Sequence, residues 1–174
     1  MTNLVSNTGV VSADTTGVGT ARIGPAAAGY GLDKAIFGYG STGSAVSMTN
    51  LVSNTGVVSA DTTGVGTARY YLAAAGYGID KAIFGYGSTG SAVSMTNLVS
   101  NTGVVSTDTT GVGTARIGPA AAGYGIDKAI FGYGYNGQNV SMTNLVSNTG
   151  VVSTDTTGVG TARFGLAVAG YSLS

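Results

Sequence analysis

The feature that most constrains this chain is a stretch of sequence, Met-Thr-Asn-Leu-Val-Ser-Asn-Thr-Gly-Val-Val-Ser, that returns every 47 residues. It begins at Met1, Met48, Met95 and Met142. The chain therefore divides into three complete copies and a shorter fourth copy: residues 1–47, 48–94, 95–141 and 142–174. Such a period is typical of proteins in which each repeat buries its apolar face against its neighbours. We expect residues 1–174 to form a single repeat domain.

The composition of the repeat indicates strands. The chain has 31 Gly among its 174 residues, many Val, Thr and Tyr, and no Glu. These residues are poor helix formers, and Val, Thr and Tyr favour strands. Disorder is typical of chains with low hydrophobicity and high net charge, whereas this chain is 43% apolar with a formal net charge of zero. The sequence can therefore bury a core.

Turn signals divide each unit into four short segments that we predict to be antiparallel strands. In the first unit that holds all four, they cover residues 23–30, 34–39, 46–53 and 57–62. The second should place Ala35, Phe37 and Tyr39 on one face and Ile36 on the other. Four such strands in a repeat of this length are typical of a propeller blade. We predict an all-β fold, a β-propeller built of four-stranded antiparallel blades from 47-residue tandem repeats.

Two parts of the repeat together resemble a known family. Thr20-Ala21-Arg22 precedes Gly-Pro-Ala-Ala-Ala-Gly-Tyr-Gly, and Asp-Lys-Ala-Ile-Phe-Gly-Tyr-Gly follows. This text resembles the kelch repeat, in which an Arg precedes the first strand and paired glycines follow the second. Here Gly38-Tyr39-Gly40 stands in place of the glycine pair, and the kelch Trp of the fourth strand is missing. The resemblance covers all four copies. It implies a propeller whose function is binding and not catalysis.

Side-chain chemistry argues against an enzyme. The chain contains neither His nor Cys, which excludes Ser-His-Asp and Cys-His arrangements and thiolate metal sites. The carboxylates recur in every unit, as structural groups do. Residues 38–43 match the pattern G-x-G-x-x-G, but a strand is predicted after them instead of the helix that phosphate binding needs. We expect no catalytic residue, no metal and no cofactor.

Charge and hydropathy also restrict the partners. Only 8% of residues are charged, so no basic surface for nucleic acid is expected. No apolar run reaches the ~18–20 residues of a membrane helix, so we expect no membrane insertion. The first residues lack the basic region and apolar stretch of a signal peptide, which fits a cytoplasmic protein or a piece of a longer one. The localisation stays unknown, with a virion or an extracellular surface as the settings considered.

Apart from an Asp-Lys pair in a turn, each copy carries one Asp and one Arg. We predict that these residues fix the connection between the fourth and first strands by hydrogen bonding or ion pairing. They are Asp14, Arg22, Asp61, Arg69, Asp108, Arg116, Asp155 and Arg163.

The copies differ at few positions, which gather in two segments: one follows the Arg and the other follows the second strand. In an up-and-down blade both segments lie at one end, which we call the variable end, and the loops of the opposite end barely change. Two explanations are open: a recognition face, or drift after a recent duplication. The candidates for binding are Tyr70, Tyr71, Tyr135, Asn136, Gln138, Asn139 and Phe164, and Tyr and Asn suit adaptable contacts.

The order of strands leaves the terminal blade incomplete, because the fourth copy ends before its second strand. Open strand edges pair with other chains, so we expect a homo-oligomer, with a dimer favoured, through this incomplete blade. The most favoured function is a non-enzymatic propeller scaffold that presents a recognition face to a protein or glycan in a viral or cell-surface context. Two alternatives are an engineered or reconstructed self-assembling repeat protein without a natural ligand, and a fibrous β-repeat structural protein.

Overall fold

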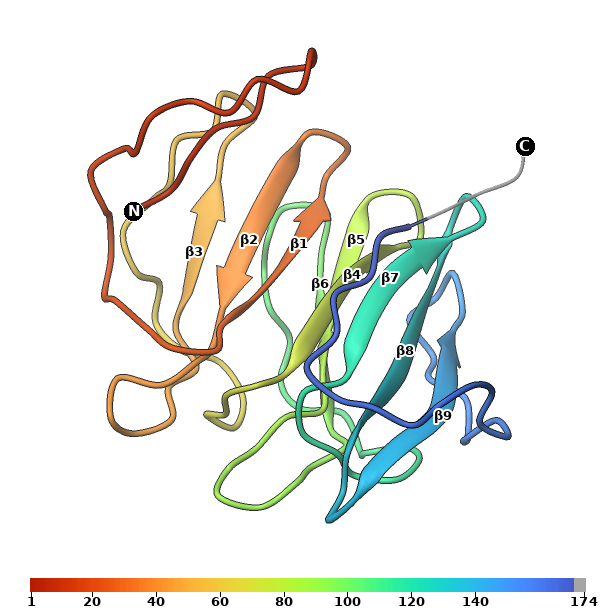
Figure 1. The fold of residues 1–174 in the computed structure, drawn as a ribbon. Coiled ribbons are helices and arrows are strands. Elements are labelled where there is room, and N and C mark those ends of the chain that lie inside the picture. The colour runs from red at the N-terminus through yellow and green to blue at the C-terminus, as the bar shows by residue number, and fades with distance from the viewer. Residues whose placement is uncertain (171–174) are drawn as a thin grey trace.

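The computed structural model describes residues 1–170, and these contain nine strands and no helix. The strands form three antiparallel sheets of three strands each (Figure 1). The first sheet contains β1 (Ala26–Tyr30), β2 (Lys34–Gly38) and β3 (Thr49–Val52). The second contains β4 (Ala73–Tyr77), β5 (Lys81–Gly85) and β6 (Thr96–Val99). The third contains β7 (Ala120–Tyr124), β8 (Lys128–Tyr135) and β9 (Asn139–Val146).

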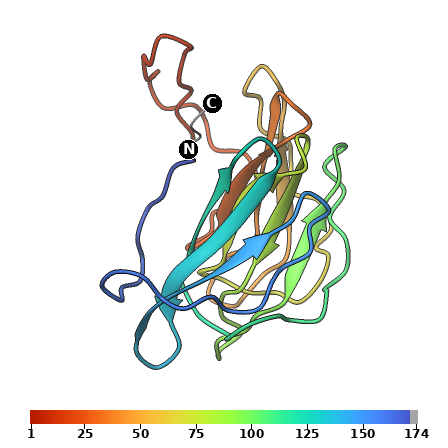
Figure 2. The ribbon, with the colours of Figure 1, turned by 90° about the vertical axis from the view of Figure 1, so that its right-hand side faces the viewer.

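Each sheet forms from local pairing within the repeat. β1 and β2 are a hairpin around Gly31-Leu32-Asp33, with Ala28 opposite Ile36, and β2 then pairs with β3. The other two sheets repeat these registers. The sheets follow one another face to face, and β4 packs between β1 and β7 (Figure 2). The all-β class predicted from the composition is confirmed.

The predicted fourth strand is wrong. Residues 57–62 form no strand, and an isolated β-bridge between Val52 and Val58 joins them to β3. Side chains interrupt the ladder: the Leu51 amide donates to the Ser59 hydroxyl (3.0 Å), and the Asn50 side-chain amide donates to the Ser59 carbonyl (3.1 Å). Backbone hydrogen bonds also join the two segments, from the Ser59 amide to the Leu51 carbonyl (2.8 Å) and from the Thr62 amide to the Thr49 carbonyl (2.8 Å). Each sheet therefore has three strands and a fourth segment held partly by side chains.

Residues 1–170 do not close into a propeller ring. The text of the first three strands occurs in that order three times, which gives three sheets. Residues 1–16 fold back on themselves through isolated bridges, such as Thr2 with Thr15. Residues 163–170 run alongside β7 without forming a strand, and they lie on the side of the molecule away from the N-terminal hairpin formed by residues 1–16 (Figure 1). Incomplete closure within one chain is what the order of strands predicts.

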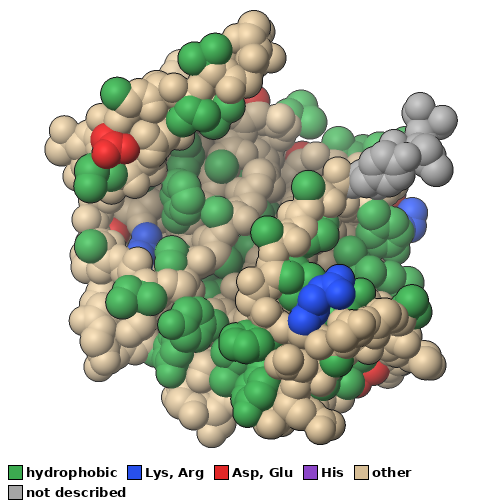
Figure 3. All heavy atoms as spheres, viewed as in Figure 1, with side chains coloured by type: hydrophobic (Ala, Val, Ile, Leu, Met, Phe, Trp, Pro, Cys, Tyr) green, Lys and Arg blue, Asp and Glu red, His purple; other side chains and the backbone are tan. Residues whose placement is uncertain are grey.

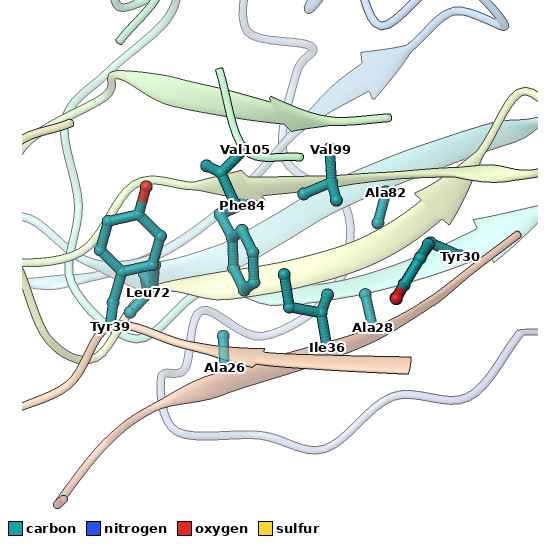
Figure 4. Close-up of a cluster of buried hydrophobic side chains, with 10 residues drawn as sticks. All are labelled: Ala26, Ala28, Tyr30, Ile36, Tyr39, Leu72, Ala82, Phe84, Val99 and Val105. Atoms are coloured by element: carbon teal, nitrogen blue, oxygen red, sulfur yellow. The ribbon is translucent and has the colours of Figure 1, made fainter. Parts of the chain in front are cut away.

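The same side chains fill the space between consecutive sheets. Phe84 of β5 is fully buried against the first sheet, where the edge of the Tyr39 ring meets it at a centroid distance of 5.2 Å. Phe131 of β8 and Tyr86 repeat this contact at 5.1 Å. Figure 4 shows the first of these clusters, with side chains from both sheets pointing toward Phe84. Its members are Ala26, Ala28, Tyr30, Ile36, Tyr39, Leu72, Ala82, Phe84, Val99 and Val105.

Tyr39 lies on the opposite side of the sheet from its predicted position. Its φ angle is 63°, a left-handed conformation that ends the alternation of faces after Gly38. The ring therefore joins Ile36 in the cluster facing the second sheet, and Phe37 does not belong to that cluster. Strict alternation along 34–39 was a wrong prediction for its last residue.

Glycines allow this close approach. A Cβ atom on Gly38 would lie 2.8 Å from Cζ of Phe84, and one on Gly85 would lie 2.7 Å from Cζ of Phe131. At Gly132 in the third sheet, the same atom would meet only Thr143, at 3.1 Å. Phe84 and Phe131 therefore each lie over a glycine of the preceding sheet, and among residues 1–170 no phenylalanine covers the third such glycine.

Replacing Phe84 with Ala should lower the free energy of unfolding by about 3–5 kcal/mol, because a fully buried ring is lost and a cavity is left. Phe37 occupies the same repeat position but is only half-buried, so Phe37→Ala should cost clearly less. Chemical denaturation followed by circular dichroism measures both values. Equal losses would contradict the inter-sheet packing described above.

Candidate binding surface

An arginine precedes each first strand, and in the second sheet it is the centre of a buried hydrogen-bonded network. Arg69 is fully buried. Its Nε donates to the carbonyl of Tyr86 (2.9 Å) and its Nη2 to Oδ1 of Asn97 (2.6 Å). The guanidinium carbon lies 4.5 Å from the centroid of the Tyr39 ring in the preceding sheet. Arg69 therefore forms hydrogen bonds within the second sheet and contacts the first sheet through a cation–π interaction with Tyr39.

Asp108 of the next copy completes this network. Its carboxylate accepts hydrogen bonds from the Asn97 side-chain amide (2.9 Å), the Thr67 amide (2.9 Å) and the Thr67 hydroxyl (2.6 Å). Arg69 Nη1 lies 3.6 Å from the same carboxylate. Burial raises the pKa of Asp108, but the hydrogen bonds from Thr67 and Asn97 and the charge of Arg69 outweigh it, so the pKa is below its ordinary value.

The other copies repeat this network with differences at the two ends of the molecule. Arg116 is also buried and lies 3.7 Å from Asp155. Arg22 donates to Asn50, whose amide binds Asp61. The structure thus joins each Arg to the Asp of the following copy: Arg22 with Asp61, Arg69 with Asp108, and Arg116 with Asp155. Asp14 instead accepts from Asn3 (2.8 Å), and Arg163 is exposed.

Sequence reasoning missed the asparagine and the tyrosine of this network. Asn97 is fully buried, as are Asn144 and Tyr86. The signal available was weak, because every copy repeats these residues and nothing marks them as different from the other invariant positions. Only their polar character at positions predicted to be in strands pointed to a buried network.

The two variable segments lie side by side in each of the three complete copies. Residue 23 forms a β-bridge with residue 41, residue 70 with residue 88, and residue 117 with residue 135. The Tyr70 amide donates to the Ser88 carbonyl (3.0 Å) and the Ser88 amide to the Tyr70 carbonyl (2.8 Å). The variable positions therefore form one continuous strip at one end of each sheet.

Aromatic rings stand out on this strip. Tyr71, Tyr135 and Phe164 are 48%, 40% and 57% exposed. The rings of Tyr70 and Tyr71 touch edge to face with centroids 5.2 Å apart, and those of Tyr135 and Phe164 lie 5.8 Å apart. Sequence reasoning did not select Ile23, which is also exposed on the strip. The structure therefore gathers the aromatic candidates into two pairs.

The polar candidates occupy the loop between β8 and β9. Asn136, Gln138 and the first residue of β9, Asn139, are exposed. The Asn136 amide donates to the Gln138 carbonyl (3.1 Å), which closes a tight turn. β8 and β9 extend further than their counterparts, and Tyr135 pairs with Asn139 across them. This longer hairpin carries three polar side chains next to the Tyr135–Phe164 pair.

Backbone hydrogen bonds between copies hold the strip in place. The Tyr71 amide donates to the Gly24 carbonyl (3.1 Å), and the Gly118 amide donates to the Tyr71 carbonyl (2.8 Å). Tyr71 has a φ angle of 52°, a left-handed conformation that is uncommon for a bulky residue. The backbone conformation of the exposed Tyr71 is therefore imposed by its hydrogen bonds to neighbouring copies, and not by the intrinsic preference of tyrosine.

The opposite end also exposes apolar side chains. Leu32, Ile79 and Ile126 are 84%, 68% and 87% exposed at the tips of the β1–β2, β4–β5 and β7–β8 hairpins. Sequence reasoning assigned no role to them because they vary only between Leu and Ile. They offer a comparison set for any binding measured at the variable end.

Residues 1–170 contain no group of three acidic side chains placed to hold a metal ion, and no helix in this range is long and apolar enough to cross a membrane. In comparisons with known proteins, no family model and no curated protein matches the chain.

Replacing Arg69 with Ala should lower the free energy of unfolding by about 3–5 kcal/mol, because the buried partners of a buried cation are left unpaired. The matched control is Arg163→Ala, which removes an exposed arginine whose hydrogen bond to the Thr161 carbonyl is long (3.4 Å). The control should cost less than about 1 kcal/mol. Thermal and urea unfolding of both variants measures the difference, and similar losses would refute a buried arginine network.

Alkali should destabilise the protein in a defined range. Burial raises the pKa of Tyr39 and Tyr86 to about 12, whereas an unfolded tyrosine has a pKa of about 10. The folded state then holds more protons than the unfolded state, so stability is full below pH ~10 and falls by up to about 1.4 kcal/mol per pH unit per tyrosine toward pH ~12.

Tyrosinate absorbance and circular dichroism, recorded together, measure this effect. Two tyrosines should ionise only near pH ~12 or when the fold is lost, and Tyr39→Phe with Tyr86→Phe should flatten the alkaline loss of stability. Ionisation of every tyrosine near pH ~10 in the folded protein would contradict the burial of these two hydroxyl groups.

Proposed function

We propose that this protein is a non-enzymatic scaffold of kelch-like propeller type that presents a recognition face at its variable end. The ligand class that suits this face is a protein or a glycan, in a viral or cell-surface context. The observation that carries the proposal is the strip of exposed aromatic rings, Tyr71, Tyr135 and Phe164, held by backbone bonds between copies.

Exposed aromatic rings on fixed supports suit binding. Aromatic side chains contribute most of the energy at many interfaces, since they bury a large area at low conformational cost. Tyr71 is bound through its backbone to Gly24 and Gly118 on either side, so little freedom is lost when a ligand covers it. Asn136 and Gln138 lie beside the Tyr135–Phe164 pair and offer donors and acceptors to hydroxyl or amide groups.

Self-association is part of the proposal. The outer faces of the first and third sheets are not covered by another complete sheet among residues 1–170, and uncovered sheets with open edges associate. A homo-oligomer, with a dimer favoured, would complete a ring of the propeller type. Sedimentation mass at micromolar concentration separates this arrangement from a monomer.

Two alternatives differ in their observable consequences. A repeat protein that was engineered or reconstructed for assembly would associate without binding a natural ligand. A fibrous β-repeat protein would form filaments, which electron microscopy distinguishes from discs. The buried and directional polar contacts of Arg69 and Arg116 favour a defined globular stack over a fibre.

The proposal is tested on an array of glycans and surface receptors. The triple variant Tyr71→Ser, Tyr135→Ser, Phe164→Ser should weaken binding by at least ~tenfold, since aromatic anchors at interfaces each contribute on the order of 1–2 kcal/mol or more. The matched control is Leu32→Ser, Ile79→Ser, Ile126→Ser, which removes exposed apolar groups at the opposite end. If only the control variant loses binding, recognition occurs at the opposite end and the proposal is wrong. If nothing on the array binds the protein, the engineered alternative is favoured.

A further inference from the structure

Three of the four copies place a tyrosine ring beneath the arginine that precedes the first strand. The guanidinium carbons of Arg69, Arg116 and Arg163 lie 4.5, 4.2 and 4.6 Å from the ring centroids of Tyr39, Tyr86 and Tyr133. In each case the tyrosine comes from the preceding sheet. Among residues 1–170, no aromatic ring lies beneath Arg22 in this way.

A pocket of about 370 Å³ lies where that ring would be. Its lining includes Arg22, Phe37, Val18 and Met1. Figure 3 shows this side of the molecule hollowed between the N-terminal hairpin and the first sheet, with apolar side chains in the hollow. Arg22 is already fixed there, since it donates to the Met48 carbonyl (2.8 Å) and to Asn50. Burial lowers its pKa, which indicates a guanidinium partly removed from water.

The equivalent spaces between sheets show what this pocket is shaped to hold. Tyr39 fills the first of them: its hydroxyl donates to the Val65 carbonyl (3.1 Å) and its amide to the Met48 carbonyl (2.9 Å). Tyr86 makes the same bonds to the carbonyls of Val112 (3.2 Å) and Met95 (3.0 Å). The glycine before each tyrosine lies under the phenylalanine of the next sheet.

The corresponding acceptors in the pocket are the carbonyls of Val18 and Met1, and no described residue donates to them. Phe37 corresponds to Phe84, which covers Gly38 between the first two sheets, and it is only half-buried. The cation, the two carbonyl acceptors and the phenylalanine are therefore all present, and each lacks the partner that it has elsewhere in the chain.

We propose that this pocket is a binding site for a strand of a partner polypeptide in which a tyrosine lies between two glycines, as in Ile-Phe-Gly-Tyr-Gly, with the tyrosine in the left-handed conformation that Tyr39 and Tyr86 adopt. The tyrosine ring would lie beneath Arg22, its hydroxyl would donate to the Val18 carbonyl, and its amide would donate to the Met1 carbonyl. The preceding glycine would lie under Phe37. Such strand addition gains affinity from main-chain bonds and specificity from side-chain pockets.

The glycine requirement makes the site selective. Between the first two sheets, a Cβ atom at the position before the tyrosine would lie 2.8 Å from the phenylalanine ring, closer than two carbon atoms can pack without displacement. A strand with any other residue before its tyrosine should therefore fit poorly. A free aromatic compound would satisfy Arg22 but would leave the Met1 carbonyl without a donor.

The test uses the 174-residue chain and a fluorescently labelled peptide, Ala-Ile-Phe-Gly-Tyr-Gly-Ser, which has the sequence of residues 35–41. Fluorescence anisotropy should show saturable binding at one site. Arg22→Ala should weaken binding by at least ~tenfold, as loss of a partly desolvated cation–π contact predicts. The matched control, Arg163→Ala, should leave the affinity unchanged, because Arg163 lies against Tyr133 of the third sheet and not in this pocket.

Peptide variants test the register independently of the folding of Arg22→Ala. Replacing the peptide's tyrosine with leucine, or its first glycine with alanine, should each weaken binding by at least ~tenfold. In Phe37→Ala the space above that glycine is open, so the alanine peptide should regain affinity for this variant only. Equal binding of all peptides, or equal binding to the wild type and Arg22→Ala, would overturn the proposal. These readouts do not involve the variable end, so they are independent of the proposed recognition function.

Discussion

The contact on which the rest of the structure depends is the seating of one sheet on the next, through a phenylalanine over a glycine and an arginine over a tyrosine. Phe84 needs Gly38 because no side chain fits between them, and Arg69 needs Tyr39 to cover a guanidinium that is removed from water. A single three-stranded sheet, with strands of four to eight residues, carries apolar groups that are buried only against the neighbouring sheet. Apolar and polar contacts therefore reach across the same boundary and position the sheets together.

The repeat and its composition were sufficient to predict the class of fold and the first three strands. The fourth strand could not be predicted correctly, because Ser59 and Asn50 read as ordinary strand residues although their side chains replace backbone partners. The face of Tyr39 was also beyond sequence pattern, since a single left-handed residue reverses the expected side. Both errors come from local hydrogen bonding and backbone conformation that a two-residue period does not describe.

The candidate site also contains residues that the sequence predicted and residues that it did not. Variation between copies led to Tyr71, Tyr135 and Phe164, and the bridges between the two variable segments place the variable positions side by side. Residues that are identical in all copies show no variation that could mark them, so the roles of Asn97 and Tyr86 could not be predicted and follow only from their burial. Differences between copies indicate exposed positions. Identity between copies does not show which buried residue packs in the core and which one forms hydrogen bonds.

Each sheet has one face that supplies the phenylalanine and another that supplies the glycine and tyrosine, so the stack has a direction. Every joint is the same and involves only adjacent copies, and adding or removing one whole copy would leave all remaining joints intact. Such a chain can change its length in units of 47 residues while each intermediate stays folded. Adding or removing a copy would therefore lengthen or shorten the stack by one sheet, a change that single substitutions do not provide.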